Sequence, residues 1–296
     1  MGENTAIAWT DHTWNPWQGC HKVSSACDNC YMYRDKKRYG QDPTIIKKSS
    51  VQTWNAPLKW HNAAKVFVCS WSDFFIEEMD EERPFAWMMI KRTPHLTYQI
   101  LTKRPERIKE CLPDDWGNGW PNVWIGVTVE NQEMADLRIP ILLQIPAAVR
   151  FVSIEPMLGP VDISKDLYQL QTGKYSMCSS YEKPIDYLNW VICGGETGPN
   201  ARPMHPGWVW SIQKQCQATE TPFFFKQWGE WYPIYGSGRL QGDEEDELAP
   251  YTWLSVEGQQ HDSGCNSDAL MLRVGKKNAG DFISGKQYHE FPEVPA

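Results

Sequence analysis

Residues 122–155 read NVWIGVTVENQEMADLRIPILLQIPAAVRFVSIE, and this stretch indicates the class of fold. Two short runs, at 122–128 and 150–153, are rich in Val, Ile and aromatic residues and are almost continuously apolar. Such continuity is typical of strands that are buried on both faces of a parallel sheet. Residues 133–143 lie between the runs and are expected to form a helix. The stretch therefore predicts a strand–helix–strand unit.

The same pattern recurs on both sides of this unit. Further apolar runs lie at 65–69, 97–101, 188–193 and 222–225, with a weaker one at 6–9. Further helices are expected at 82–91, 106–111 and 206–218. Alternation of strands and helices over this length predicts an α/β fold, either a barrel or a doubly wound sheet. In both architectures ligands bind at the carboxyl ends of the strands.

Nearly every predicted strand ends in side chains that form hydrogen bonds or carry charge. In chain order these are Ser70, Ser72 and Asp73; Lys103 and Arg104; Glu130 and Asn131; Ser153 and Glu155; Glu196; and Lys226. A purely structural barrel would not need polar groups at so many strand ends, so we expect one shared polar site. Any single residue could instead cap the following helix, a position that Ser, Thr, Asp and Asn favour.

The composition restricts the class of protein. Hydrophobic residues make up 41% of the chain, which is enough for a full core, and no run approaches the ~18 apolar residues of a membrane span. The N-terminus lacks the basic and apolar regions of a signal peptide, which predicts a cytoplasmic protein without a membrane partner. The net charge of −8 argues against a large contact with duplex DNA. A local basic channel with a few of the 16 Trp residues could still bind a single base.

The sequence changes in character near residue 229. Gly-Ser-Gly at 236–238 and an acidic run at 243–247 indicate loops, and residues 270–274 indicate a strand before a basic turn. We therefore expect two parts. Residues 1–228 would form the barrel with the cysteine loop, and residues 229–296 a C-terminal appendage that covers the barrel mouth.

Three of the nine cysteines lie within eleven residues, in the segment WNPWQGCHKVSSACDNCYMY at 14–33. Clustered cysteines in a cytoplasmic protein indicate a metal site rather than disulfides. Three thiolates can hold a four-iron four-sulfur cluster and leave one iron open to a substrate. Zinc is the alternative, and it would need a fourth ligand, for which His21 and His12 are close in sequence. The candidate metal ligands are Cys20, Cys27 and Cys30 in a C-x6-C-x2-C pattern.

A three-cysteine loop after the first strand of a parallel barrel resembles the radical S-adenosylmethionine (SAM) superfamily. The usual spacing there is C-x3-C-x2-C, so the x6 gap of this chain is a departure. More closely, the whole chain resembles a phage-associated three-cysteine family of largely uncharacterised proteins. The matching segments are WTDHTWNPWQGCHKVSSACDNCY, LTKRPERI, NVWIGVTVENQ, FVSIEPMLGPVDI, GGETGPNARPMHPGWV, PFFFKQWGEW and RVGKKNAG. The resemblance implies a partial, radical SAM-like (β/α) barrel of about six to seven parallel strands, with a 4Fe-4S cluster and SAM as cofactors.

The resemblance also implies roles for the polar residues. The residues expected to bind SAM are Lys103 or Arg104 for its carboxylate; Ser70, Ser72 and Asp73 for its ammonium; Glu130 and Asn131 for its ribose; Tyr31 and Tyr33 for its adenine; and Ser153 beside them. The residues left as catalytic candidates toward a substrate are Glu155, Glu196, His205 and Lys226.

Three functions follow from these observations. The first is a radical SAM enzyme in the host cytoplasm, an isomerase, lyase or transferase that needs an electron donor. Its favoured substrate is a nucleobase of phage DNA such as a modified thymine, presented as a nucleotide or in single-stranded or flipped DNA. The second is a non-catalytic zinc or Fe–S module that recruits a phage or host protein. The third is a metal-dependent nuclease that uses the carboxylates at the strand ends.

Overall fold

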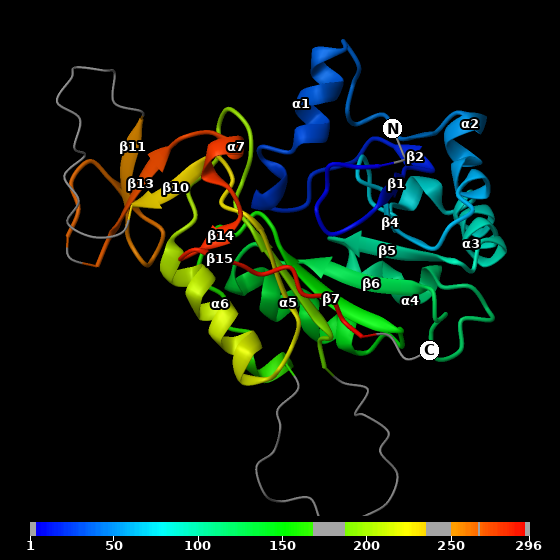
Figure 1. The fold of residues 1–296 in the computed structure, drawn as a ribbon. Helices are drawn as coiled ribbons and strands as arrows, with labels where there is room; N and C mark the ends of the chain where they lie inside the picture. The colour runs from blue at the N-terminus through cyan, green and yellow to red at the C-terminus, as the bar shows by residue number, and fades with distance from the viewer. Residues whose placement is uncertain (1–3, 168–186, 235–249, 266, 294–296) are drawn as a thin grey trace, which may run out of the picture.

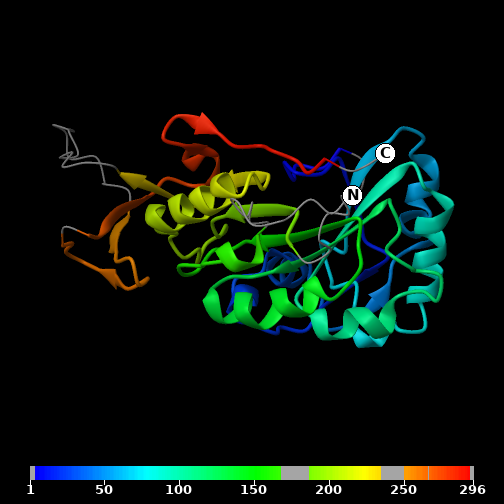
Figure 2. The ribbon, with the colours of Figure 1, turned by 90° about the horizontal axis from the view of Figure 1, so that it is seen from below.

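A computed structural model describes residues 4–167, 187–234, 250–265 and 267–293. Its main feature is a sheet of seven parallel strands, which follow one another in the sheet in chain order. The sheet curls into half a barrel, with helices on its outer face (Figure 1 and Figure 2). This confirms the α/β class and the parallel strands. The seven strands are β1 (His12–Trp14), β4 (Ala64–Val68), β5 (Leu96–Thr102), β6 (Val123–Thr128), β7 (Val149–Ile154), β8 (Trp190–Gly194) and β9 (Phe223–Gln227).

The first strand differs from its prediction. Residues 12–14, not 6–9, pair with Val66, Phe67 and Val68 of β4. Trp9 is buried instead in an aromatic cluster, where its ring packs against Phe67 and Trp190. The predicted run is therefore apolar because it fills a core, not because it forms a strand.

Both faces of the sheet are apolar, which explains why its strands lack alternation. One face packs against the helices. The helices on it are α3 (Arg83–Arg92), α4 (Ile108–Cys111), α5 (Gln132–Leu143) and α6 (Pro206–Ala218). The concave face carries a second cluster of mostly aromatic side chains, among them Trp124, Phe151, Trp190 and Phe224. Gly126 belongs to this face because a Cβ there would lie 2.5 Å from the Phe151 ring.

The helices agree with the predicted ones to within one or two residues, with one exception. The stretch expected as a helix at 106–111 is a 3-10 turn, Pro105–Arg107, followed by α4. Pro105 has no amide proton, so the chain starts this segment with a tight turn.

Smaller elements surround the half-barrel. The cysteine loop runs from β2 (Trp17–Gln18), which pairs with β3 (Lys47–Lys48), through a 3-10 turn at Ser25–Cys27 into α1 (Tyr31–Arg38); α2 (Val51–Trp54) follows. Near the C-terminus β10 (Trp231–Ile234), β13 (Ala269–Arg273), β11 (Tyr251–Leu254) and β12 (Gln260–His261) form an antiparallel sheet. The last elements are α7 (Lys276–Ala279) and the hairpin of β14 (Phe282–Ile283) and β15 (Lys286–Gln287). The loop segments predicted at 236–238 and 243–247 lie outside the described residues.

The helices within the described residues are all too short or too polar to span a bilayer.

Candidate functional site

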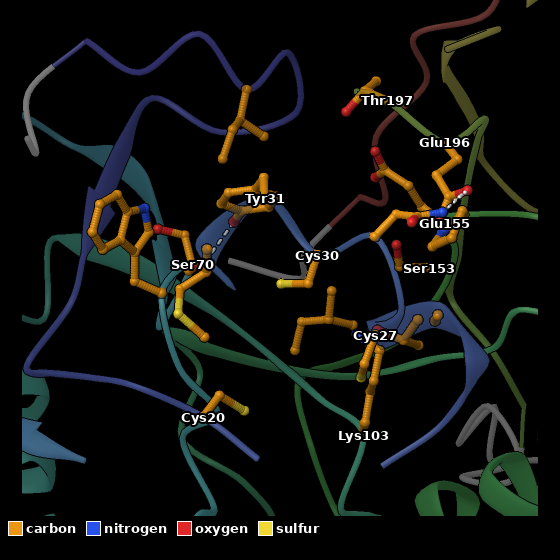
Figure 3. Close-up of a pocket in the computed structure, with 18 of the residues that line it drawn as sticks. Cys20, Cys27, Cys30, Tyr31, Ser70, Lys103, Ser153, Glu155, Glu196 and Thr197 are labelled. Atoms are coloured by element: carbon orange, nitrogen blue, oxygen red, sulfur yellow. Dashed lines mark hydrogen bonds between the residues drawn. The ribbon is translucent and has the colours of Figure 1, made fainter. Parts of the chain in front are cut away.

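A cavity of about 630 Å³ lies at the carboxyl ends of the parallel strands. It brings together most of the residues predicted for the site, from both the cysteine loop and the strand ends (Figure 3). The loop and α1 contribute Cys20, Cys27, Cys30, Tyr31 and Tyr33; the strand ends contribute Ser70, Ser72, Asp73, Lys103, Arg104, Ser153, Glu155, Glu196 and Lys226. Ile7, Trp9, Phe67 and Leu101 add an apolar wall from the concave face.

The three cysteines lie around one region of this cavity (Figure 3). All three are free and partly exposed. Cys20 follows Gly19, whose φ of +93° and close approach to the Ile45 carbonyl leave no room for a side chain. Cys27 ends the 3-10 turn, and Cys30 is the N-cap residue of α1, where the helix dipole favours negative charge.

The three thiols are ligands of the type that an iron–sulfur cluster needs. Each cysteine binds a different iron in a four-iron cluster, so three thiols need to surround a shared space rather than converge on one atom. Within the described residues no group of three or more His, Cys, Asp and Glu side chains is arranged to hold a metal ion. Burial raises the pKa of the Cys20 thiol to about 11, with Asp73 adding to the rise and Arg104 opposing it.

Hydrogen bonds from surrounding side chains hold the backbone of the cysteine loop. The Tyr33 hydroxyl donates to the Cys20 carbonyl at 2.5 Å, and Ser72 Oγ donates to the Gly19 carbonyl at 2.6 Å. The Tyr31 hydroxyl donates to the Ser70 carbonyl at 2.5 Å, which ties α1 to the end of β4. Three residues expected to contact SAM thus use their hydroxyl groups to support the loop.

Asp73 joins the ends of β4 and β5 to the same loop. Its carboxylate accepts hydrogen bonds from Thr102 Oγ1 at 2.7 Å and from the Lys103 amide at 3.0 Å. Arg104 lies 3.2 Å from the same carboxylate, and its guanidinium also donates to the His21 carbonyl at 3.0 Å. Its Nη1 is 3.8 Å from Cys20 Sγ. Asp73 and Arg104 are therefore engaged with each other and with the loop.

Lys103 differs from its neighbour. It is partly exposed, lines the cavity, and has no ion pair among the described residues. Its side chain extends toward Cys27 (Figure 3). Of the two cations predicted to bind a carboxylate, Lys103 is the one that is available.

The far side of the cavity carries a second charged pair. Lys226 Nζ on β9 lies 2.5 Å from Glu155 Oε1, just past the end of β7. Both side chains are less than one-fifth exposed. Ser153 lies beside them, buried at the end of β7 (Figure 3). Within the part of the chain that the structure describes, Glu155 and Lys226 form no hydrogen bond to the cysteine loop, and both line the cavity.

Glu196 belongs to a clamp between β8 and the cysteine loop. It is buried and accepts hydrogen bonds from Arg202 Nη2 at 2.6 Å, Arg202 Nε at 2.9 Å and Asn29 Nδ2 at 3.0 Å. Arg202 also donates to the Ser25 carbonyl at 2.9 Å. Asn29 and Ser25 lie in the spacers between the cysteines, so Glu196 fixes the loop through two partners.

Three predicted residues lie away from the cavity lining. Glu130 is fully buried and paired with Arg138 of α5 at 3.0 Å. Asn131 is the N-cap of α5 and accepts from the Met134 amide, while His205 is the N-cap of α6 and accepts from the Gly207 amide. Asn131 and His205 therefore cap helices, and neither lines the cavity.

Several residues of the site were not predicted. Asn15 bonds to Ser70 Oγ and to the Trp71 amide, and Asn29 belongs to the clamp. Both are polar residues inside the cysteine motif, which was the available signal. The C-terminal part contributes Glu230, which accepts from the Gly198 amide, and Lys276; both line the cavity. Both residues belong to the predicted C-terminal appendage, and no sequence motif linked them to the strand ends.

The side chains that a zinc site or a magnesium-dependent nuclease would use have other partners in this structure. His21, which follows Cys20 in the sequence, has Nε2 2.6 Å from Glu78 Oε1, and His12 stacks on Trp60. The carboxylates that a nuclease would use for magnesium are each paired with a cation, namely Asp73 with Arg104, Glu155 with Lys226 and Glu196 with Arg202.

Residues 4–292 match the family described as "Protein of unknown function (DUF5131)". The chain belongs to this family. The comparisons with curated proteins and with solved structures found no match.

Proposed function

We propose that the chain is a radical SAM enzyme that holds a 4Fe-4S cluster on Cys20, Cys27 and Cys30. The observation that carries this proposal is the shared cavity at the carboxyl ends of seven parallel strands, in which the free thiols of the cysteine motif lie near Lys103. Lys103 has no ion pair among the described residues. Three cysteines leave one iron without a protein ligand, which is the arrangement that chelation by an amino acid requires.

The cysteine side of the cavity would orient the cofactors. Lys103 would bind the carboxylate of SAM because its ammonium group has no partner among the described residues. When bound, the cluster and SAM supply one-electron cleavage of the C5′–S bond, which releases methionine and a 5′-deoxyadenosyl radical. The electron for this chemistry would come from an external donor.

The far side of the cavity would hold the substrate. Glu155 and Lys226 offer an acceptor and a donor of opposite charge, and Trp9 and Phe67 offer aromatic surface. A nucleobase has polar edges and flat faces that suit such a site, so a base of phage DNA remains our favoured substrate. Glu155 and Lys226 together carry no net charge, so they suit a neutral nucleobase. Such a base does not require a basic protein, and the net charge of this chain is −8.

The test is anaerobic reconstitution with iron and sulfide, then incubation with SAM and dithionite. We expect about four irons per chain and formation of 5′-deoxyadenosine and methionine in equal amounts. A protein that binds one zinc and no iron would support the binding-module alternative. A fully clustered protein that neither binds nor cleaves SAM would contradict the proposal.

A further inference from the structure

The surface around α1 differs in charge from the rest of the molecule. Residues 31–48 contain six Lys and Arg residues against two Asp, whereas the whole chain contains 29 Lys and Arg against 37 Asp and Glu. The side chains of Lys37, Arg38 and Lys47 are exposed, and they form no ion pair among the described residues. This face is therefore a positive patch on an acidic protein.

Apolar side chains close in sequence to these basic residues are also exposed. Tyr39 is 69% exposed, Ile45 57% and Val23 43%. Exposed aromatic and aliphatic residues among basic ones are typical of a surface that binds another protein. We call the residues 22–23, 37–39 and 45–47 the α1 face. Figure 1 shows that α1 projects from the half-barrel, so a partner can reach it.

A second cavity connects the α1 face to the cysteine loop. It has a volume of about 430 Å³, and its lining includes Lys22, Lys37 and Pro43. Cys30 and Tyr33 line both this cavity and the larger one. The two cavities thus share a wall, and a partner that covers the second cavity would lie across this wall from the larger one.

We propose that the α1 face is the docking surface for an acidic electron-carrier protein. This inference depends on the proposed function, which requires one electron per cleavage from outside the chain. The positive charge and the exposed apolar residues suit a small acidic protein that carries a flavin or an iron–sulfur cluster. The exposed aliphatic side chains of Val23 and Ile45 favour a protein over a nucleic acid.

The experiment compares two reductants. The triple variant K37E/R38E/K47E reverses the charge of the α1 face and leaves the residues of the larger cavity unchanged. The matched control K59E/K109E/K214E reverses three exposed lysines elsewhere. Each protein is reconstituted anaerobically, and cluster reduction is followed by absorbance with either dithionite or a reduced acidic flavodoxin. Fluorescence anisotropy with labelled flavodoxin measures binding directly, at two salt concentrations.

We expect the triple variant to lose flavodoxin-driven reduction, and to raise the Kd for flavodoxin, by about tenfold or more. Reduction by dithionite and the control variant should match the unmodified protein. The neutral variant K37Q/R38Q/K47Q should show an intermediate effect, which excludes misfolding as the cause.

Other outcomes are distinguishable. Equal flavodoxin-driven reduction in all variants, with dithionite also effective, would overturn the docking assignment alone. Loss of oligonucleotide binding or of self-association in the triple variant, with flavodoxin binding unchanged, would also overturn it. Failure of the unmodified protein to take up a reducible cluster would instead overturn the proposed function.

Discussion

The two sides of the large cavity use their polar groups differently. On the cysteine side, Tyr33, Ser72, Arg104 and Arg202 donate to backbone carbonyls of the loop. On the far side, Glu155 and Lys226 bond to each other and face the cavity. The loop has little regular secondary structure, so side chains must satisfy its carbonyl groups and fix its shape. Among the described residues, Glu155 and Lys226 make no hydrogen bond to the loop. They are therefore the pair that we propose for contact with a substrate.

The largest effect that distinguishes the two sides should come from the thiols. Cys20→Ala, Cys27→Ala and Cys30→Ala should each abolish cluster formation, because each would remove one of the three ligands that we propose for the cluster. Cys111→Ala and Cys265→Ala, which lie outside the cavity lining, are the controls. Iron and sulfide are counted after anaerobic reconstitution. Full cluster content in any of the first three variants would contradict the assignment of that cysteine as a cluster ligand.

The next effect concerns the clamp that supports the loop. Arg202→Ala should lower the free energy of unfolding by about 2–3 kcal/mol, since it leaves the buried Glu196 carboxylate without its cation. It should also reduce iron uptake, because Arg202 holds the Ser25 carbonyl. Urea denaturation and iron analysis measure both. Arg92→Ala, at an exposed arginine, should change neither. Unchanged stability in Arg202→Ala would show that the loop holds its shape without the clamp.

A smaller effect is expected at Lys103, which has no ion pair among the described residues. Lys103→Gln should weaken SAM binding by about tenfold, the value of one charge-assisted hydrogen bond. Cluster content should stay unchanged, because no hydrogen bond from the Lys103 side chain to the loop is present among the described residues. Isothermal titration of the reconstituted protein with SAM measures the affinity. Lys103→Arg should retain most of it, and Lys109→Gln serves as the exposed control. An unchanged Kd would remove Lys103 from the cofactor site.

The smallest effect on the fold is expected on the far side. Lys226→Met should lower the free energy of unfolding by only about 1 kcal/mol, because Glu155 is partly exposed to the cavity and can be hydrated. Iron uptake should match that of the unmodified protein. Urea denaturation and iron analysis again provide the measurement. A loss of stability as large as that of Arg202→Ala would mean that the pair supports the structure instead of facing a substrate.

The pattern of apolar runs was sufficient to predict the parallel sheet. Runs such as 122–128 and 150–153 are continuously apolar because both faces of the sheet are buried, one under helices and one under aromatic rings. The same signal failed at 6–9, where Trp9 is buried without belonging to a strand. An apolar run reports burial, and only pairing with a neighbour makes it a strand.

The sequence also determined that polar residues gather at one edge, because parallel strands place their carboxyl ends together. It could not determine what each residue does there. A hydroxyl or a carboxylate can support a loop, cap a helix or face a cavity. Its role depends on which hydrogen-bonding groups of the backbone or of other side chains lie within about 3 Å of it. Ser72 reaches Gly19, Glu196 reaches Arg202 and Asn29, and Asn131 caps α5. The contacts of Ser72 with Gly19 and of Glu196 with Asn29 span 53 and 167 residues, so only the tertiary structure could assign them. The cap at Asn131 is local, and the sequence offered it as an alternative.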